Sequence, residues 1–170
     1  AEHSERFSET VIAEMRGGSD EDGSSPFWKW LEDNFFSLDF PTADYLTGIG
    51  KKVFIAELMP KYPIYVNLLS PEAQQVINKV HPKTVPALRL LEAEGFSRRG
   101  YVDIFDGGPT VETQTASVKT VRQSQKCQVL IGDVANDNKY IICNSKVADF
   151  RATSAPVLLR ETANQVGISK

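Results

Sequence analysis

The first two-thirds of the chain mixes short apolar runs typical of strands with apolar stripes typical of helices. Residues 11–16 form a compact apolar run stopped by Gly17 and Gly18, which predicts a buried strand. Ser25 followed by Pro26 predicts a helix start, with serine as the N-cap and proline at the first helical position. The aromatic face that follows predicts a helix over residues 26–36 whose stripe belongs to the core rather than to a ligand pocket.

The middle of the chain carries further start and stop signals. Thr42 is expected to cap a helix that breaks at Gly48 and Gly50, and the β-rich run 64–69 predicts a strand. Three more elements are expected, namely a helix over 71–80 capped by Ser70, a helix over 84–91 capped by Thr84 and stopped by Gly95, and a strand over 101–105.

From residue 113 onward the composition shifts to Thr, Ser, Gln, Val and Lys. Short apolar runs at residues 126–132, 139–143 and 150–159 alternate with polar turns and predict strands. The chain is therefore expected to divide into a mixed α/β (α+β) domain over residues 1–112 and a small β appendage over residues 113–170.

Composition narrows the function classes. With 170 residues, 41% apolar and 24% charged, the chain matches ordinary globular proteins. The net charge of −3 and the scattered basic residues argue against a nucleic-acid partner, and no apolar run is long enough to cross a bilayer. No cysteine or histidine cluster suits a metal, and Cys127 and Cys143 are expected to be reduced core thiols. Without secretion signals, a cytoplasmic protein is expected.

Candidate chemistry concentrates between residues 80 and 110. Histidine is the residue type best suited to give or take a proton, so His81 is a candidate, although a histidine before a proline is by itself more typical of a solvated turn. Asp103 and Asp106 lie at the end of a predicted strand beside Gly107 and Gly108, where backbone can approach a ligand closely. They could bind a cation, or Asp106 could simply form the Asp-Gly-Gly turn.

Two weaker candidates lie earlier in the chain. Glu57 interrupts the apolar run 53–59, so it lies either on the solvent side of a helix or at the wall of a cleft. Gly50 and Lys51 offer flexible backbone amides beside an ammonium group and could contact the phosphates of a nucleotide-like molecule, although a solvated turn is the more ordinary interpretation.

Longer blocks of sequence resemble a known family. The blocks AEMRGGSDEDGSSPFW, ADYLTG, FIAELMPKYPIY, VHPKTVPA and GYVDIFDGGPTVE are closely similar to arginine N-succinyltransferases. The segment LLEAEGFSRRGYVDIF is similar to the closing helix and strand of acyl-CoA N-acyltransferases, the GNAT-like fold. The resemblance covers residues 11–112 well and the β appendage more thinly.

The resemblance implies a GNAT-like mixed sheet flanked by helices and a specific reaction. In this family the succinyl group of succinyl-CoA, a co-substrate rather than a tightly bound cofactor, passes to the α-amine of L-arginine. The histidine of the VHP block is the family's proton donor, which implies that role for His81. A guanidinium favours carboxylate partners, so Asp103, Asp106 and, at lower rank, Glu57 are the substrate-binding candidates, and Gly50 and Lys51 are those for CoA.

The resemblance also implies that the chain is the C-terminal half of a longer enzyme. Family members have an N-terminal half that contributes to succinyl-CoA binding, and their C-terminus continues into a further strand. The expected partners are therefore that N-terminal half or a homologous subunit, in an oligomer. Two alternatives stay open, namely a non-catalytic partner or regulatory subunit that binds a basic amino acid, and an enzyme whose preferred acceptor is ornithine.

Overall fold

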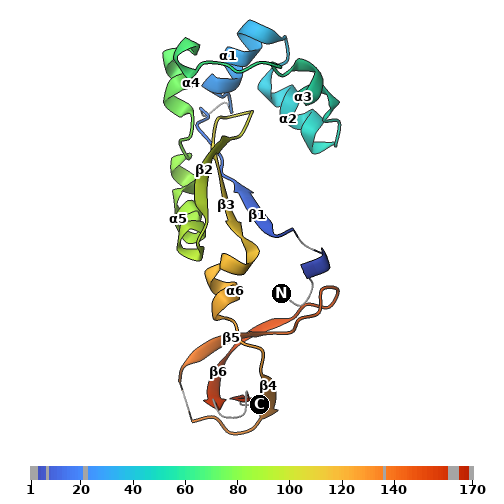
Figure 1. Cartoon of the computed structure of the whole chain (residues 1–170), viewed down its shortest axis with the longest axis vertical. Coiled ribbons are helices and arrows are strands. Elements are labelled where there is room, and N and C mark those ends of the chain that lie inside the picture. The colour runs from blue at the N-terminus through green and yellow to red at the C-terminus, as the bar shows by residue number, and fades with distance from the viewer. Residues whose placement is uncertain (1–3, 7, 21–22, 136, 161–164, 169–170) are drawn as a thin grey trace. The chain divides into compact units, whose positions relative to one another are not determined.

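The computed structural model describes residues 4–6, 8–20, 23–135, 137–160 and 165–168 (Figure 1). The chain divides into two compact units, one of Phe7–Arg122 and one of Ala1–Arg6 with Gln123–Lys170. The predicted domain boundary at residue 112 stays a prediction, and each unit is described by itself.

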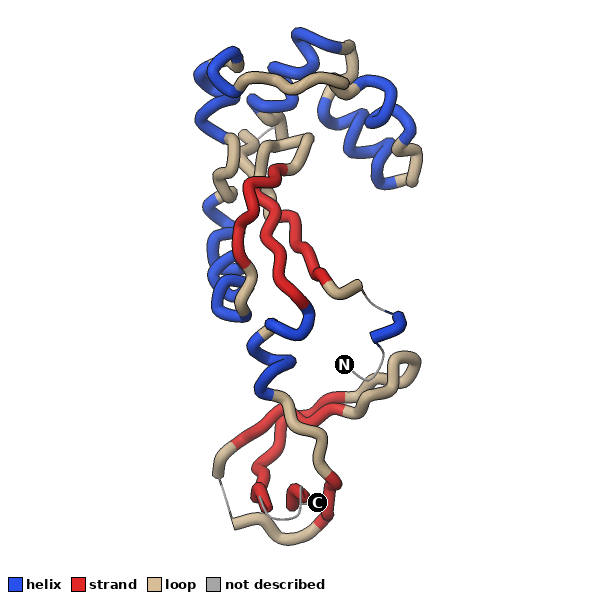
Figure 2. The backbone as a smooth tube through the Cα atoms, viewed as in Figure 1, coloured by secondary structure: helices blue, strands red, loops and turns tan. Residues whose placement is uncertain are grey.

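The larger unit is built on a three-stranded antiparallel sheet (Figure 2). Its strands are β1 (Thr10–Glu14), β2 (Ser97–Val102) and β3 (Pro109–Gln114), in the order β1-β3-β2. β1 confirms the predicted early strand, but the prediction that it is buried was wrong, because Val11 and Ile12 are exposed. β3 was not expected, because the Gly-Gly-Pro sequence before it indicated a break; its alternating buried positions nevertheless make it the central strand.

The strand predicted over residues 101–105 was placed too late. β2 ends at Val102, and the next residues turn because the carboxylate of Asp103 accepts the backbone N–H of Phe105 at 2.8 Å. This side chain competes with a strand partner for the N–H group, as short aspartate side chains commonly do. Both aspartates therefore lie in the turn that joins β2 to β3.

One face of the sheet is covered by α5 (Val85–Glu94), which follows the short 3₁₀ helix η3 (Pro82–Thr84) (Figure 1). Leu88 of α5 is buried against Met15 and Val111 in the core of this layer. Gly95 ends the helix with φ of 103°, which confirms the predicted stop at a left-handed position that glycine adopts without strain. Thr84 lies at the N-cap position but makes no side-chain capping bond.

The helical part of the same unit contains α1 (Pro26–Phe35), α2 (Phe40–Gly48), α3 (Val53–Leu58), the 3₁₀ helix η2 (Val66–Leu68) and α4 (Pro71–Val76). The predicted caps Ser25 and Ser70 are confirmed, since each hydroxyl accepts a backbone N–H in the first turn of its helix. Trp28 of α1 is almost fully buried, and its ring stacks on Phe105 at 5.1 Å between centroids. Trp28 and Leu31 of the aromatic stripe are therefore core, as predicted, whereas Phe35 at the end of the helix is exposed.

Three local predictions in this part were wrong. Asp39 rather than Thr42 caps α2, because its carboxylate accepts both the backbone N–H and the hydroxyl of Thr42, and these bonds lower the pKa of Asp39. Residues 64–69 form no strand but lead into η2. Helix α4 ends at Val76 instead of residue 80, since Asn78 adopts a positive φ of 60° that a helix does not tolerate.

The smaller unit contains a four-stranded sheet in the order β4-β7-β6-β5. Its strands are β4 (Gln128–Ile131), β5 (Lys139–Cys143), β6 (Ala152–Arg160) and β7 (Gln165–Ile168), and the 3₁₀ helix η1 (Ser4–Arg6) belongs to the same unit. Three of these strands were predicted and β7 was not. Val157 and Val166 are buried in this sheet. The 3₁₀ helix η4 (Thr115–Ser117) and α6 (Lys119–Gln123) follow β3 in the chain.

Neither Cys127 nor Cys143 forms a disulfide bond, in line with the prediction, but Cys143 is exposed and Cys127 only partly buried. The prediction that they lie in the core was wrong because both are at strand ends of a thin, single-layer sheet. In the described part of the chain, no helix is long and apolar enough to span a membrane.

Three segments of the larger unit meet at what we call the three-segment junction, formed by residues 15–17, 78–81 and 106–109. The backbone N–H of Met15 donates to the carbonyl of Pro109 at 3.0 Å. A Cβ on Gly108 would lie 2.1 Å from the Met15 carbonyl oxygen and 2.6 Å from the Gly17 nitrogen. Backbone atoms cannot rotate aside as a side chain can, so the junction requires glycine at this position.

We expect Gly108→Ala to destabilise the protein by about 3 kcal/mol, because the new methyl group must push two backbone segments apart. Denaturant unfolding measures the difference. Gly48→Ala is the matched control, since nothing lies within 4 Å of a Cβ at the end of α2. The control should raise stability by up to about 1 kcal/mol, the helix preference of alanine over glycine. Equal effects of the two substitutions would contradict the close approach at Gly108.

Candidate functional site

His81 occupies the N-cap position of η3, at the edge of the three-segment junction. Its Nδ1 accepts the backbone N–H of Lys83 at 3.2 Å. In the neutral ring an accepting Nδ1 means that the proton is on Nε2. Nε2 makes no hydrogen bond to any described residue, and the side chain is half-buried. The ring is thus oriented by one nitrogen and presents an N–H group with the other.

Three hydrogen bonds hold the backbone of the His81 segment. The N–H of His81 donates to the carbonyl of Arg16 at 2.8 Å, just beyond the end of β1. The N–H of Asn78 donates to the carbonyl of Gly107 at 2.7 Å, in the turn before β3. A third bond comes from Arg98 of β2, whose guanidinium donates to the carbonyl of Asn78 at 2.9 Å. The position of His81 is therefore set by long-range contacts with the sheet.

Asp106 bridges two of these segments with its side chain. One carboxylate oxygen accepts the N–H of Gly17 at 2.7 Å, and the other accepts the N–H of Gly108 at 2.8 Å. The second of these bonds is the Asp-Gly-Gly turn that the sequence left open as an interpretation. The first joins residues 89 positions apart and was not anticipated.

Asp103 lies in the same turn with a different use of its two oxygens. Oδ1 accepts the N–H groups of Phe105 and Asp106 at 2.8 and 3.3 Å, whereas Oδ2 accepts no bond from the described residues. Burial raises the pKa of the Asp103 carboxyl, and the negative charges of Asp106 and Glu14 raise it further, against the lowering effect of the two backbone N–H groups. A cation at Oδ2 would lower the electrostatic cost of the negative charge on Asp103.

The basic side chains near His81 in the sequence have separate surroundings. Arg98 donates a hydrogen bond to the Asn78 carbonyl, and Arg99 forms an ion pair with Glu112 at 3.5 Å. Lys83 is exposed, and only its backbone N–H makes a contact that involves His81. Of these three cations, Lys83 is therefore the one whose charge has no carboxylate or carbonyl partner among the described residues.

The weaker candidates lie on α2 and α3. Glu57 is exposed on α3, on the solvent side that the sequence left as one of two possibilities. The N–H groups of Ile49, Gly50 and Lys51 all donate to carbonyls at the end of α2, at 2.9–3.1 Å. These backbone amides are occupied by the helix end, so the exposed ammonium groups of Lys51 and Lys52 are what this loop offers to a phosphate.

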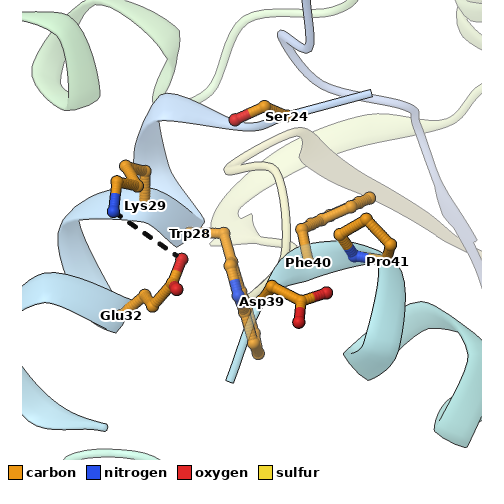
Figure 3. Close-up of a pocket in the computed structure, with 7 residues that line it drawn as sticks. All are labelled: Ser24, Trp28, Lys29, Glu32, Asp39, Phe40 and Pro41. Carbon is orange, nitrogen blue, oxygen red and sulfur yellow. Dashed lines mark ion pairs between the residues drawn. The ribbon is translucent and has the colours of Figure 1, made fainter. Parts of the chain in front are cut away.

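A small pocket lies between α1 and the start of α2 (Figure 3). Its volume of about 110 Å³ is well below the roughly 300 Å³ typical of small-molecule sites. It is lined by Ser24, Trp28, Lys29, Glu32, Asp39, Phe40 and Pro41. None of these residues belongs to the three-segment junction. Asp39 already accepts a hydrogen bond from Thr42, and Lys29 already donates one to Asp33. The pocket is therefore a packing gap at the α1–α2 corner.

The structure places His81 and Asp106 in the three-segment junction. Asp103 lies in the adjoining turn, where its N–H donates to the Gly108 carbonyl at 2.7 Å, and Glu57, Gly50 and Lys51 lie on other elements. Sequence reasoning missed Arg16, Gly17 and Asn78, whose backbone groups complete the junction. A paired glycine after a strand was the signal for Gly17, because it permits close backbone approach as well as a strand stop. Within the described ranges, no group of three or more histidine, cysteine or carboxylate residues could hold a metal ion.

Comparison with known proteins gives a consistent result. A family described as "Arginine N-succinyltransferase beta subunit" matches residues 1–120. The arginine N-succinyltransferase subunit beta of Pseudomonas aeruginosa is 52% identical over 157 residues, which are 92% of this chain and 46% of that protein. The arginine N-succinyltransferase of Yersinia enterocolitica is 51% identical over 151 residues, 87% of this chain and 44% of its own length.

A solved structure is also similar. "The structure of arginine/ornithine succinyltransferase subunit AI from Pseudomonas aeruginosa" superimposes with a TM-score of 0.79 at 36% identity, over 98% of this chain and 47% of that one. This match confirms the expected fold class, a GNAT-like mixed α/β arrangement with sheets flanked by helices. The chain spans about half the length of the curated relatives it matches.

We expect Asp103→Asn to raise the melting temperature at pH 7, because the substitution removes a charge that is buried beside two other carboxylates. The amide oxygen can still accept the N–H groups of Phe105 and Asp106. The folded pKa of Asp103 is raised, so the cost of its charge is present above that pKa and disappears as the pH falls through it. The difference in melting temperature should therefore shrink as the pH falls toward 4. A difference that stays constant or grows at low pH would contradict this origin.

Proposed function

This chain belongs to the arginine N-succinyltransferase beta-subunit family, and we propose that it contributes His81 as the proton donor of a succinyltransferase. The reaction moves the succinyl group of succinyl-CoA to the α-amine of L-arginine. The observation that carries the proposal is the orientation of the His81 ring, whose Nδ1 is held by Lys83 N–H while Nε2–H is left without a partner among the described groups.

The proton balance of the reaction defines the role of this nitrogen. The neutral α-amine attacks the thioester carbonyl, a C–N bond forms, the C–S bond breaks, and a proton from the amine ends on the CoA sulfur. In the neutral ring, Nε2–H can donate a hydrogen bond to the departing thiolate or to the oxyanion that precedes it. Full transfer from Nε2 requires the doubly protonated ring, in which Nδ1 releases its 3.2 Å contact with Lys83.

Among the predicted carboxylates, Asp103 is the one we assign to the guanidinium of arginine. Its Oδ2 is free of bonds to described residues and its surroundings are negative, whereas both oxygens of Asp106 are already used by backbone N–H groups. Glu57 is exposed on α3 and stays a lower-ranked substrate-binding prediction.

We assign succinyl-CoA as a co-substrate that is consumed in each turnover and leaves as free CoA, with no tightly bound cofactor. Lys51 is the candidate for its phosphates, with Gly50 giving the loop its positive φ of 77°. The chain spans 46% of a relative named as a subunit, so we propose that the rest of the full-length subunit, or a homologous subunit, supplies most of the CoA site in an oligomer. We assign the enzyme to the cytoplasm, where acyl-CoA thioesters are available.

The alternative is a non-catalytic partner that binds a basic amino acid while another part of the protein performs the transfer. Release of free thiol from succinyl-CoA in the presence of arginine separates the two. A catalytic role requires thiol release by the full-length subunit to depend on His81, whereas a regulatory role does not.

We expect His81→Asn to lower kcat of the full-length subunit by about 10²-fold or more, the usual contribution of a positioned acid or base. Asparagine can still accept the Lys83 N–H with its side-chain oxygen, so the local turn is kept while the ionisable ring is removed. His81→Ala removes both and serves as the comparison. Thiol release that is unchanged in both variants would exclude His81 as the proton donor.

Ornithine is a second candidate acceptor, since the solved relative is named an arginine/ornithine succinyltransferase subunit. Asp103 has one free oxygen, so it cannot form the two-bond pair that distinguishes guanidinium from ammonium. We expect arginine to be preferred over ornithine in kcat/KM by no more than about tenfold, the discrimination that a single hydrogen bond of about 1.4 kcal/mol gives. Competition between the two amines in the thiol assay measures the ratio. A larger value requires another carboxylate, and faster turnover of ornithine makes it the preferred acceptor.

A further inference from the structure

We propose that Asp106 is a positioning residue for His81, and that it acts through the backbone of the three-segment junction rather than by contact with substrate. The proposal rests on the function proposed above and concerns the same site. It assigns to Asp106 a role different from the substrate binding that its sequence position first indicated.

The carboxylate of Asp106 joins the two segments to which the His81 segment is bonded. Gly17 N–H and Gly108 N–H donate to its two oxygens at 2.7 and 2.8 Å. Each of these residues is adjacent in sequence to a carbonyl that accepts from the His81 segment. Arg16, beside Gly17, accepts from His81 N–H at 2.8 Å, and Gly107, beside Gly108, accepts from Asn78 N–H at 2.7 Å.

The spacing of the two acceptor carbonyls therefore depends on one side chain. If the carboxylate no longer held Gly17, the Arg16 carbonyl could move independently of the Gly107 carbonyl. The two acceptors that anchor residues 78–81 would then no longer be at a fixed separation. The junction has little room to compensate, since a Cβ on Gly17 would lie 2.5 Å from both Asp106 Oδ1 and the Gly108 nitrogen. A shift at this point is passed along the backbone to His81.

A carboxylate is required chemically at this position. Both N–H groups are donors, so the residue between them must accept with both of its terminal atoms. Asparagine has one accepting oxygen and one NH₂ group, which would face an N–H donor at less than 3 Å. Asp106→Asn is therefore nearly identical in shape but breaks one of the two bonds. It changes the placement of His81 without removing any group from a substrate.

The test compares kinetic constants of the full-length subunit with and without the substitution. We expect Asp106→Asn to lower kcat by about tenfold or more while KM for arginine stays within about twofold, since a small misplacement of a catalytic group costs rate rather than binding. In the His81→Asn background the same substitution should lower kcat by less than about twofold, because residues that act through one another are not additive.

The competing role predicts the opposite pattern. If Asp106 holds the guanidinium, Asp106→Asn raises KM for arginine by about tenfold or more and does so equally in the His81→Asn background, which would overturn the proposal. Asp44→Asn is the matched control, because Asp44 is exposed on α2 and carries the same charge. It should leave kcat and KM unchanged, so a loss of kcat in the control would assign the effect to net charge and also overturn the proposal.

A spectroscopic measurement tests whether Asp106 positions His81 independently of whether His81 is catalytic. Long-range ¹H–¹⁵N spectra of the imidazole nitrogens report which nitrogen carries the proton, and the His81→Asn variant identifies the His81 signals. We expect the Nε2–H form in the unmodified protein and a mixture of forms in Asp106→Asn at an unchanged fold, judged by the other signals. Unchanged His81 signals would overturn the positioning role. Changed signals without dependence of thiol release on His81 would support it and refute the catalytic function.

Discussion

The larger unit depends on one carboxylate shared by two backbone N–H groups. Burying N–H groups without partners is costly, so the buried Gly17 and Gly108 each need an acceptor. Asp106 meets this need for Gly17 and Gly108, and in doing so joins the residues that follow β1 to those that precede β3, just beyond the end of the ladder between the two strands. Both glycines follow from the same constraint, because any side chain there would occupy the space of the bonds.

The same turn connects the sheet to the helices. Phe105 lies between Asp103 and Asp106 and stacks on Trp28 of α1, while Phe40 of α2 meets both rings edge-on at 6.2–6.3 Å. Offset and edge-on aromatic pairs of this kind add stability beyond the area they bury. The turn is thus held by hydrogen bonds on its polar side and by aromatic packing on its apolar side. Its two aspartates cannot move without disturbing α1.

Structural features that depend on residues close together in the sequence could be predicted, whereas those that depend on residues far apart could not. Ser25, Ser70 and Gly95 were recognisable because a cap or stop acts within three or four residues. Asp39 and Thr42 are both good caps three residues apart, and only the structure shows that one accepts from the other. β3 was missed because its pattern is largely polar and it follows a Gly-Gly-Pro sequence, although its position between two strands buries alternate residues. The link from Asp106 to Gly17 spans 89 positions and leaves no local pattern, so His81 was singled out by resemblance and not by its contacts.

β1 is an edge strand of the three-stranded sheet, which leaves part of its backbone unpaired in the described structure. Glu9 and Met15, the residues that flank β1, form backbone hydrogen bonds with Thr115 and Pro109. Because bonding residues alternate along an antiparallel ladder, the N–H and C=O groups of Ile12 and Glu14 point away from the described sheet. The Ile12 and Val11 side chains beside this margin are exposed. An uncovered strand with apolar neighbours is a template on which other extended chains can add. Recombinant production of this stretch alone therefore favours self-association, and a lysine at Ile12, directly opposite Glu112 of β3, is a substitution that would discourage it.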